Sequence, residues 1–321
     1  MGHRHFPGVY KIENTVFVNA GTVSDNKTRH GDVNSFNKIT IQEDSISITV
    51  QRTDNTRFVH TFNRMHQHIF HDFGERRCRL VHISNSFISR SEKFQRPHFS
   101  KAVQTINSSG ADLLIHCGGI VEEGIAGNYE LAARMMKKIT VPVFTAPAGR
   151  DINYLGYRLF PVYFGGFDKA HILENMVFQG ISSSQYDSNV GIIGTTERHM
   201  LLEQFKQHPD KMKCLFLHHN VLPIPHSREK GLLEDSGDFL YDIINAKIDL
   251  VLTGTSSHPF AVRVNDTIVI NANSISSVYT RSMGGNSFNM IDIYENVIVV
   301  YEVNSLWGIR KIIGMWNING A

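Results

Sequence analysis

From residue 79 to residue 253 the sequence alternates short apolar runs with stretches of helical periodicity, which favours a layered α/β domain. The runs that we interpret as strands cover residues 80–83, 113–115, 141–145, 190–193, 214–217 and 250–253. Apolar residues at 99, 102, 103 and 106 recur at the spacing of one helix face, which predicts an amphipathic helix between Pro97 and Gly110. Further helices are predicted near residues 129–139, 198–207 and 239–246.

After Gly254 the pattern changes to short strands separated by turn residues. The expected antiparallel strands cover residues 262–264, 267–270, 288–293 and 298–303. The last part of the chain should therefore consist mainly of hairpins.

The chain also repeats part of itself. Residues 2–46 align without a gap to residues 254–298, at a constant offset of 252. The shared letters include Asn19-Ala20 with Asn271-Ala272, Thr28-Arg29 with Thr280-Arg281, and Asn34 to Asn37 with Asn286 to Asn289. We interpret the repeat as a tandem duplication in which the front copy survives only as its C-terminal part.

This interpretation predicts four regions: an orphan C-terminal tail of a duplicated domain over residues 1–57, a linker over 58–77, a full domain over 78–305 and a C-terminal tail over 306–321. The linker contains His60, His66, His68 and His71. These histidines fit no compact structural-zinc pattern with nearby cysteines, so we interpret the linker as a connector that packs on a domain surface.

A polar motif follows five of the predicted strands. The loops beyond the carboxyl ends of strands in such a sheet converge on one crevice, where sites are commonly built. The candidate site residues in these motifs are Asn85, Phe87, Gly119, Gly149, Arg150, Asp151, His218, His219, Thr255 and Ser257.

Taken in order, the five motifs resemble the blocks D-x-H, G-D, G-N-H-D, H and G-H-x-H of the calcineurin-like metallophosphoesterase superfamily. In that family the blocks hold two divalent metals bridged by an aspartate. The resemblance spans most of residues 79–303 and implies a layered β-sandwich flanked by helices, preceded here by an extra N-terminal β-rich segment. The motifs are specific as an ordered set of five, and weak one by one.

Most ligand positions of the resemblance are changed in this chain. Six of them carry other residues than the family has: Asn85, Phe87, Gly119, Gly149, Thr255 and Ser257. Of the usual ligands only His218 remains. Two +2 ions about 4 Å apart repel by roughly 17 kcal/mol at an effective dielectric constant near 20, and carboxylates must offset this repulsion. Neutral Asn85 and Gly119 cannot, so we expect no metal cofactor in the main domain.

Other site residues have two interpretations each. Arg150 either binds an anion or forms an ion pair with a neighbour such as Asp151 or Glu122. His218 and His219 are expected to line a polar cleft, hydrogen-bonded to backbone or water, and Phe87 is expected to fill the space of a lost metal and histidine.

These residues leave two main functions open. The first is a catalytically inactive binding, scaffold or regulatory unit whose partner is an active phosphoesterase chain or a second copy. The alternative is a metal-dependent phosphoesterase completed in trans, because the repeat keeps an intact Gly2-His3-Arg4-His5 motif. His3 and His5 would then donate to a Mn, Zn or Fe pair in a partner chain. A gene fragment is a third interpretation.

Composition narrows the class of partner. Lys and Arg total 32 against 30 Asp and Glu, a net charge of +2, so nucleic acid is not indicated. The three cysteines are far apart and suggest no disulfide framework, which favours a reducing cytoplasm. No run of about 18 apolar residues predicts a membrane span.

Overall fold

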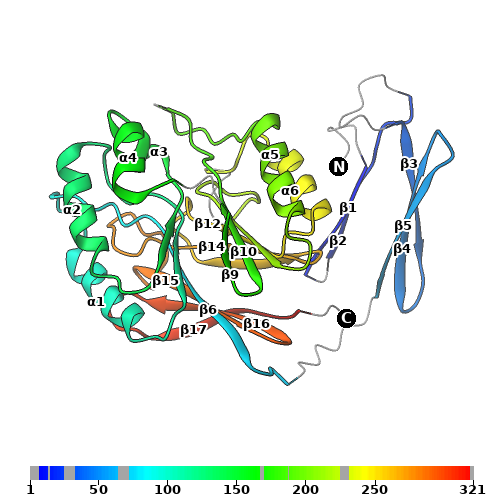
Figure 1. Cartoon of the computed structure of the whole chain (residues 1–321). Coiled ribbons are helices and arrows are strands. Elements are labelled where there is room, and N and C mark those ends of the chain that lie inside the picture. The colour runs from blue at the N-terminus through cyan, green and yellow to red at the C-terminus, as the bar shows by residue number, and fades with distance from the viewer. Residues whose placement is uncertain are drawn as a thin grey trace. The chain divides into compact units, whose positions relative to one another are not determined.

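The computed structural model describes residues 7–13, 15–24, 33–63, 72–166, 170–186, 188–224 and 231–318 (Figure 1). The chain divides into two compact units. Unit 1 comprises residues 1–69 and 263–265, and unit 2 comprises residues 70–262 and 266–321. No helix in the described ranges is long and apolar enough to cross a membrane.

Unit 2 contains a six-stranded sheet in the order β17-β16-β15-β6-β7-β8. Its strands are β6 (Arg76–Ile83), β7 (Leu113–His116), β8 (Val143–Thr145), β15 (Ser287–Tyr294), β16 (Val297–Asn304) and β17 (Arg310–Asn317). The strands β6, β7 and β8 are parallel, whereas β15 is antiparallel to both β6 and β16. The sheet thus joins an α/β half to a hairpin half.

A second sheet of unit 2 runs in the order β14-β12-β11-β10-β9, with β13 next to β14. Its strands are β9 (His171–Leu173), β10 (Met176–Gly180), β11 (Met212–Phe216), β12 (Leu250–Thr253), β13 (Phe260–Val264) and β14 (Thr267–Asn271). The ladders β10–β11, β11–β12 and β12–β14 are parallel. Leu80 and Ile115 of the first sheet share one buried cluster with Phe216 and Leu252 of the second, so the two sheets form a sandwich.

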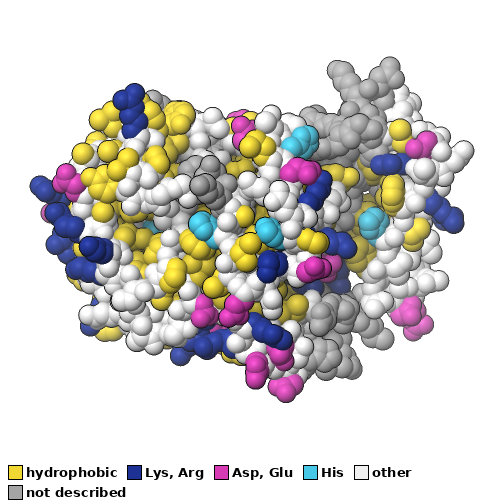
Figure 2. Space-filling model, in the orientation of Figure 1, with side chains coloured by type: hydrophobic (Ala, Val, Ile, Leu, Met, Phe, Trp, Pro, Cys, Tyr) yellow, Lys and Arg dark blue, Asp and Glu magenta, His cyan; other side chains and the backbone are white. Residues whose placement is uncertain are grey.

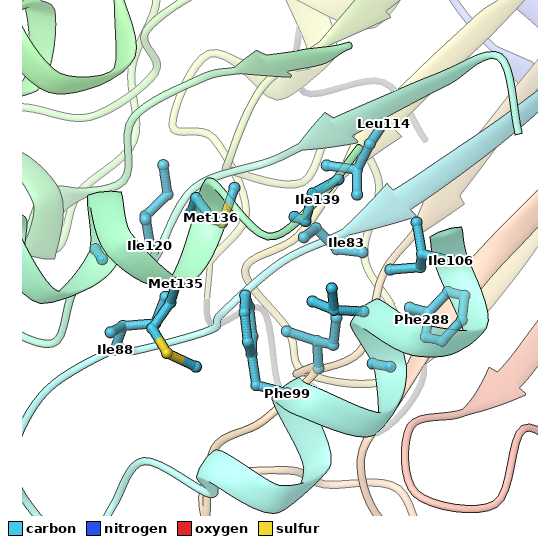
Figure 3. Close-up of a cluster of buried hydrophobic side chains, with 14 of the residues drawn as sticks. Ile83, Ile88, Phe99, Ile106, Leu114, Ile120, Met135, Met136, Ile139 and Phe288 are labelled. Atoms are coloured by element: carbon cyan, nitrogen blue, oxygen red, sulfur yellow. The ribbon is translucent and has the colours of Figure 1, made fainter. Parts of the chain in front are cut away.

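Helices cover the outer faces of the sandwich. They are α1 (Arg96–Asn107), α2 (Ala126–Met136), α3 (Gly149–Ile152), α4 (Gly156–Phe164), α5 (Thr195–Lys206) and α6 (Ser236–Asn245). The apolar face expected of α1 is buried as predicted and packs in one cluster with Ile83, Leu114 and Phe288 of the first sheet (Figure 3). In Figure 1, α5 and α6 lie beside the second sheet. The expected α/β sandwich flanked by helices is confirmed.

The helix α4 was not predicted. Its Phe160 is buried in the cluster that also holds the α1 side chains. Exposed apolar side chains gather over α4 and the residues before it, among them Tyr154, Leu155 and Val162 (Figure 2). Leu159, Tyr163 and Phe164 also pack against this cluster, so α4 is anchored by one face and exposes apolar side chains on another.

One predicted strand is wrong. Residues 190–193 form only isolated bridges, from Gly191 to Ser184 and to Leu233. The strand that lies beside β11 on the side away from β12 is β10, which the sequence analysis does not predict. Every residue of β10 is buried, so its apolar run lacks the alternation that marks a half-exposed strand. The strand β14 lies next to β13, which directly precedes it along the chain, and on its other side it pairs in parallel with β12, a pairing that the sequence analysis does not predict.

Unit 1 is made of strands. A hairpin of β1 (Gly8–Ile12) and β2 (Thr15–Asn19) accompanies a three-stranded sheet of β3 (Ser35–Ile41), β4 (Ser45–Arg52) and β5 (Arg57–Asn63). Its small core contains Val9, Ile48 and Val50. The strand β5 covers the first residues of the segment expected as a linker, and in unit 2 β17 covers part of the expected C-terminal tail.

The strands of unit 1 follow the offset of the sequence repeat. The strands β1, β2, β3 and β4 begin at residues 8, 15, 35 and 45, and β13, β14, β15 and β16 begin at 260, 267, 287 and 297, each later by 252. A hydrogen bond repeats as well: Asn37 Nδ2 donates to Asn19 O at 3.0 Å, and Asn289 Nδ2 donates to Asn271 O at 3.1 Å. The repeated letters therefore encode repeated local structure.

Candidate functional site

A cavity of about 340 Å³ lies in unit 2 where the segments after β6, β8, β11 and β12 meet. Eight of the residues expected in the site line it: Asn85, Phe87, Gly149, Arg150, His218, His219, Thr255 and Ser257. These eight residues therefore converge on one cavity, as the sequence analysis predicts for the strand-end motifs. Gly119 and Asp151 are not among its lining residues.

The loop after β6 has an unusual backbone. Asn85 and Phe87 have φ values of 50° and 45°, a left-handed conformation that non-glycine residues rarely adopt. The backbone N–H of Asn85 donates to Gly118 O at 2.9 Å, and the backbone N–H of Phe87 donates to Gly119 O at 2.8 Å. These bonds fix the loop against the segment after β7. Such strain persists where the surrounding structure over-determines it, and it clusters at functional sites.

The position expected for the bridging aspartate is closed. A Cβ atom on Gly119 would lie 2.5 Å from Asn85 Oδ1 and 2.8 Å from Phe87 Cε1, and the φ of Gly119 is 72°. The side chain of Asn85 donates to Gly254 O at 2.6 Å and to Ser257 Oγ at 3.0 Å. Side chains and their hydrogen bonds occupy the space that a carboxylate would need.

Asp151 plays a structural part. Its carboxylate accepts the backbone N–H groups of Gly119 and Ala148 at 2.8 Å each and that of Val121 at 3.0 Å. Burial raises the pKa of this carboxyl to about 6, and the backbone donors act in the opposite direction. Asp151 therefore fastens two loops of the site and does not face the cavity.

The two histidines after β11 are hydrogen-bonded. Nδ1 of His218 lies 2.7 Å from Cys117 O, and Nδ1 of His219 lies 2.9 Å from Ser183 Oγ. Burial lowers the pKa of His218 to about 3 and that of His219 to about 4. Both rings are therefore neutral at pH 7.

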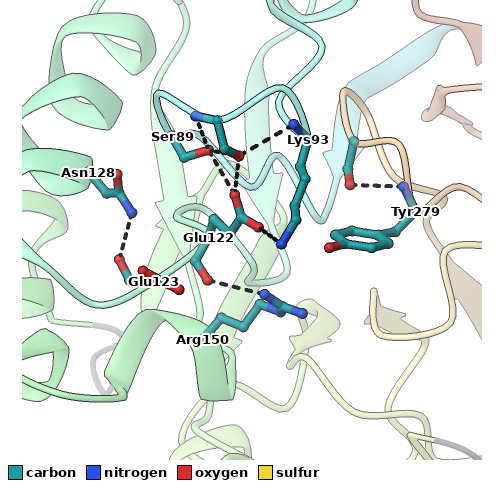
Figure 4. Close-up of polar contacts among 9 residues, drawn as sticks. Ser89, Lys93, Glu122, Glu123, Asn128, Arg150 and Tyr279 are labelled. Atoms are coloured by element: carbon teal, nitrogen blue, oxygen red, sulfur yellow. Dashed lines mark hydrogen bonds and ion pairs between the residues drawn. The ribbon is translucent and has the colours of Figure 1, made fainter.

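Arg150 packs against two aromatic rings that also contact each other edge to face. Its guanidinium carbon is 5.0 Å from the ring centre of Phe87 and 5.7 Å from that of Tyr279. Arg150 Nη1 donates to the backbone O of Glu122 at 3.3 Å, while the Glu122 carboxylate pairs with Lys93 at 3.0 Å (Figure 4). Within the described residues, no carboxylate pairs with Arg150. The expected ion pair with Asp151 or Glu122 is therefore not formed.

The residues present do not fit a two-metal centre. In the described part of the chain, no group of three or more His, Cys, Asp or Glu side chains could hold a metal ion. The described residues of the cavity lining include two neutral histidines and no carboxylate, whereas two adjacent cations need negative ligands. His3 and His5 lie outside the described residues.

Several residues of this region were not among the predicted site residues. They include Tyr279 and Arg281, which line the cavity, and Ser183, which orients His219. Arg281 belongs to the repeated pair Thr280-Arg281, so the internal repeat contained a signal for it. Tyr279 and Ser183 carried no such signal.

Comparison with known proteins identifies the fold. No family model matches the chain, but a curated relative and several solved structures do. A probable cyclic nucleotide phosphodiesterase of Coxiella burnetii is 24% identical over 186 residues, which are 55% of this chain and 74% of that protein.

Solved structures of phosphatases have the same fold as this chain. A purple acid phosphatase of yellow lupin (Lupinus luteus) has a TM-score of 0.57 at 11% identity and covers 85% of this chain, which spans only 59% of that enzyme. A dimetal phosphatase of Danio rerio has a TM-score of 0.56 at 10% identity, over 75% of this chain and 100% of its own. GAP50 of Plasmodium has a TM-score of 0.55 at 12% identity, over 77% and 90%. The chain thus has the calcineurin-like metallophosphoesterase fold.

Proposed function

We propose that unit 2 is a metal-independent binding domain that takes a phosphorylated small molecule into the cavity and does not hydrolyse it. The main support is the charge of the lining: among the residues that the structure describes, Arg150 and Arg281 are its charged side chains and no acidic residue lines it. In a two-metal enzyme the cations of the site are metals held by carboxylates. Here the arginines are the cations.

Guanidinium groups match phosphate geometry with paired hydrogen bonds. Each phosphate–arginine contact near 4 Å is worth about 1 to 4 kcal/mol between the dielectric constants of water and of a protein surface. The rings of Phe87 and Tyr279 hold Arg150 in the lining, and the donors that are not bonded to Glu122 O are available to a ligand. A larger hollow of about 700 Å³ shares Arg281 but is lined by Glu302, which disfavours an anion there.

Absence of turnover follows from the same residues. A neutral histidine with a pKa near 3 is a weak base and carries no proton to give at pH 7, so His218 is poorly suited to general acid–base work. The closed position at Gly119 also leaves no place for the bridging carboxylate of a metal pair. A protein of this fold, GAP50, is described as the anchor in the inner membrane complex of Plasmodium, an example of a role other than catalysis.

We further propose that residues 1–57 derive from a second copy of the domain by tandem duplication. Three observations share the offset of 252 residues and support this proposal. They are the aligned sequence letters, the first residues of four strand pairs, and the equivalent hydrogen bonds of Asn37 and Asn289.

Calorimetric titration of the whole chain with inorganic phosphate and with AMP tests the binding proposal. AMP is chosen because the Coxiella relative is described as a probable cyclic nucleotide phosphodiesterase. Binding should weaken by about tenfold or more in Arg150→Ala and in Arg281→Ala, in line with the loss of one charge-assisted contact. The matched control is Arg158→Ala, an exposed arginine that stacks on Tyr157 outside the cavity and should bind as the parent does.

The second arm measures hydrolysis of bis(4-nitrophenyl) phosphate and bound metal per chain, with and without Mn²⁺. We expect no turnover and no stoichiometric metal. Turnover that depends on Mn²⁺ would overturn the proposal, as would phosphate binding that is equal in all three arginine variants.

A further inference from the structure

The strand β3 of unit 1 leaves apolar side chains in solvent. It is an end strand of its sheet, and in the described part of the chain its only strand partner is β4. Phe36, Ile39 and Ile41 are 50%, 52% and 66% exposed. Ile39 and Ile41 lie opposite Ile48 and Ile46 of β4, so they extend the face that carries the core of unit 1.

The equivalent side chains in unit 2 are buried. At the offset of 252, the counterparts of Phe36, Ile39 and Ile41 are Phe288, Ile291 and Ile293 of β15. Their exposures are 0%, 0% and 2%. The same residue types in the same strand are therefore covered in one copy and open in the other.

Unit 2 identifies what covers them. The strand β6 pairs antiparallel with β15 and places Leu80 opposite Ile291 and Cys78 opposite Ile293, within one apolar cluster. On the other face, Phe288 packs in the cluster that contains Ile106 and the other buried residues of α1 (Figure 3). The cover is thus a strand and the helix that follows it along the chain.

We propose that β3 is the docking edge for a partner polypeptide that carries a β6-like strand followed by an α1-like helix. The proposal rests on the duplication proposed above. The partner strand pairs antiparallel with β3 and adds to the sheet through main-chain hydrogen bonds, as in β-strand addition. Its apolar residues lie opposite Ile39 and Ile41, and its helix covers Phe36.

The composition of β3 supports an edge built for pairing. Edge strands that must stay unpaired are commonly short, bulged or interrupted by proline and charge. The strand β3 pairs with β4 over seven consecutive residues without a register shift, and Lys38 is its one charged residue.

One position of β3 indicates which residue the partner strand should not carry opposite it. In unit 2, Asp292 of β15 binds Arg79 of β6 through Arg79 Nε at 2.6 Å and Nη2 at 2.7 Å. The residue of β3 at the same offset is Thr40. The partner strand therefore needs apolar side chains at two alternate positions. An arginine between them would have no acidic partner on β3, because Thr40 stands there.

The probe is a synthetic peptide with the sequence of residues 75–108, which contains β6 and α1, and with the substitution Arg79→Thr, because β3 has no acidic residue to pair with an arginine there. Its binding to the whole chain is measured by fluorescence anisotropy in reducing buffer, with a scrambled peptide as the reference. We expect saturable binding that weakens by about tenfold or more in the variant Ile39→Lys/Ile41→Lys, because charge replaces the apolar contact. The matched control is Val59→Lys, an apolar residue 58% exposed on β5, the opposite edge of the same sheet.

Hydrogen exchange supplies a second readout, since binding at this edge should protect amides in residues 35–41. Absence of saturable binding, equal binding by the scrambled peptide, or equal binding by Ile39→Lys/Ile41→Lys would overturn the proposal. A dimer of the chain alone that the same double substitution dissociates would also overturn it, because a second copy would then cover the face. Phosphate titration of these variants separates this result from the cavity, which β3 does not line.

Discussion

At the scale of single residues, the site combines an unusual backbone with side chains that differ from those of the family. Asn85, Phe87 and Ser257 have left-handed φ values of 50°, 45° and 46° at three positions where the family resemblance expects metal ligands. Hydrogen bonds hold this geometry, including the one from Asn85 Nδ2 to Ser257 Oγ at 3.0 Å. The shape of the cavity therefore depends on this backbone and on the side-chain contacts that hold it.

Adding one methyl group at Gly119 tests how closed the site is. We expect Gly119→Ala to lower the free energy of unfolding by about 2 to 4 kcal/mol, because its Cβ would overlap Asn85 and Phe87 and its φ is positive. The control is Gly127→Ala in α2, where a Cβ meets nothing within 4 Å. That change should be neutral or stabilise by about 1 kcal/mol or less. Urea unfolding measures both, and equal effects would contradict the closed position.

At the scale of elements, the pairing of β6 with β15 joins the parallel and antiparallel halves of the first sheet. The Arg79 guanidinium binds both oxygens of Asp292, and its Nη1 donates to Ser109 O at 2.5 Å. The Asp292 side chain is only 2% exposed. The ion pair therefore sits in a desolvated strand interface.

Asp292→Ala should lower the free energy of unfolding by about 3 to 5 kcal/mol, since it leaves the largely buried Arg79 charge without its partner. The comparison is Glu203→Ala, which breaks the exposed pair with Lys206 and should cost about 0.5 kcal/mol or less. Chemical denaturation measures both variants. A loss at Asp292 no larger than that at Glu203 would show that the pair does not join these strands energetically.

At the scale of the whole molecule, buried histidines make stability depend on pH. Burial lowers the pKa of His82 and that of His116 to about 3, from a value of 6.5. Below pH 6.5 the unfolded chain binds protons that the folded chain excludes, so stability falls as the pH drops from 6.5 toward 3. Asp151 acts in the opposite direction between about pH 4 and 6, because burial raises its pKa to about 6.

The four buried histidines with a lowered pKa (His82, His116, His218 and His219) outweigh the two carboxyls with a raised pKa (Asp151 and Asp249). Urea unfolding at pH 7.5, 6 and 5 should therefore give a decreasing free energy of unfolding. Each histidine contributes up to about 1.4 kcal/mol per pH unit. In His116→Asn the decrease should be smaller by about that amount. The same slope in His116→Asn and the parent chain would contradict a neutral, buried His116.

Local pattern was enough for much of the fold. The helix face of α1, the strand β6 and the hairpin strands β15 and β16 all follow from periodicity, which depends only on neighbours along the chain. The strand β10 was missed because a fully buried apolar run carries no alternation. The short apolar run at residues 190–193 was interpreted as a strand, but it makes only isolated bridges, and Val190 is 41% exposed.

The sequence by itself determined the strand-end motifs, the repeat and the changed ligand positions, because these are properties of residue order. Tertiary structure decided that Asn85 and Phe87 close the space beside Gly119, that Arg150 stacks with Tyr279, and that Asp151 bonds backbone. It also decided that Ile39 is exposed where Ile291 is buried. Burial depends on which distant segment covers a side chain, and two identical stretches of sequence can therefore differ in burial.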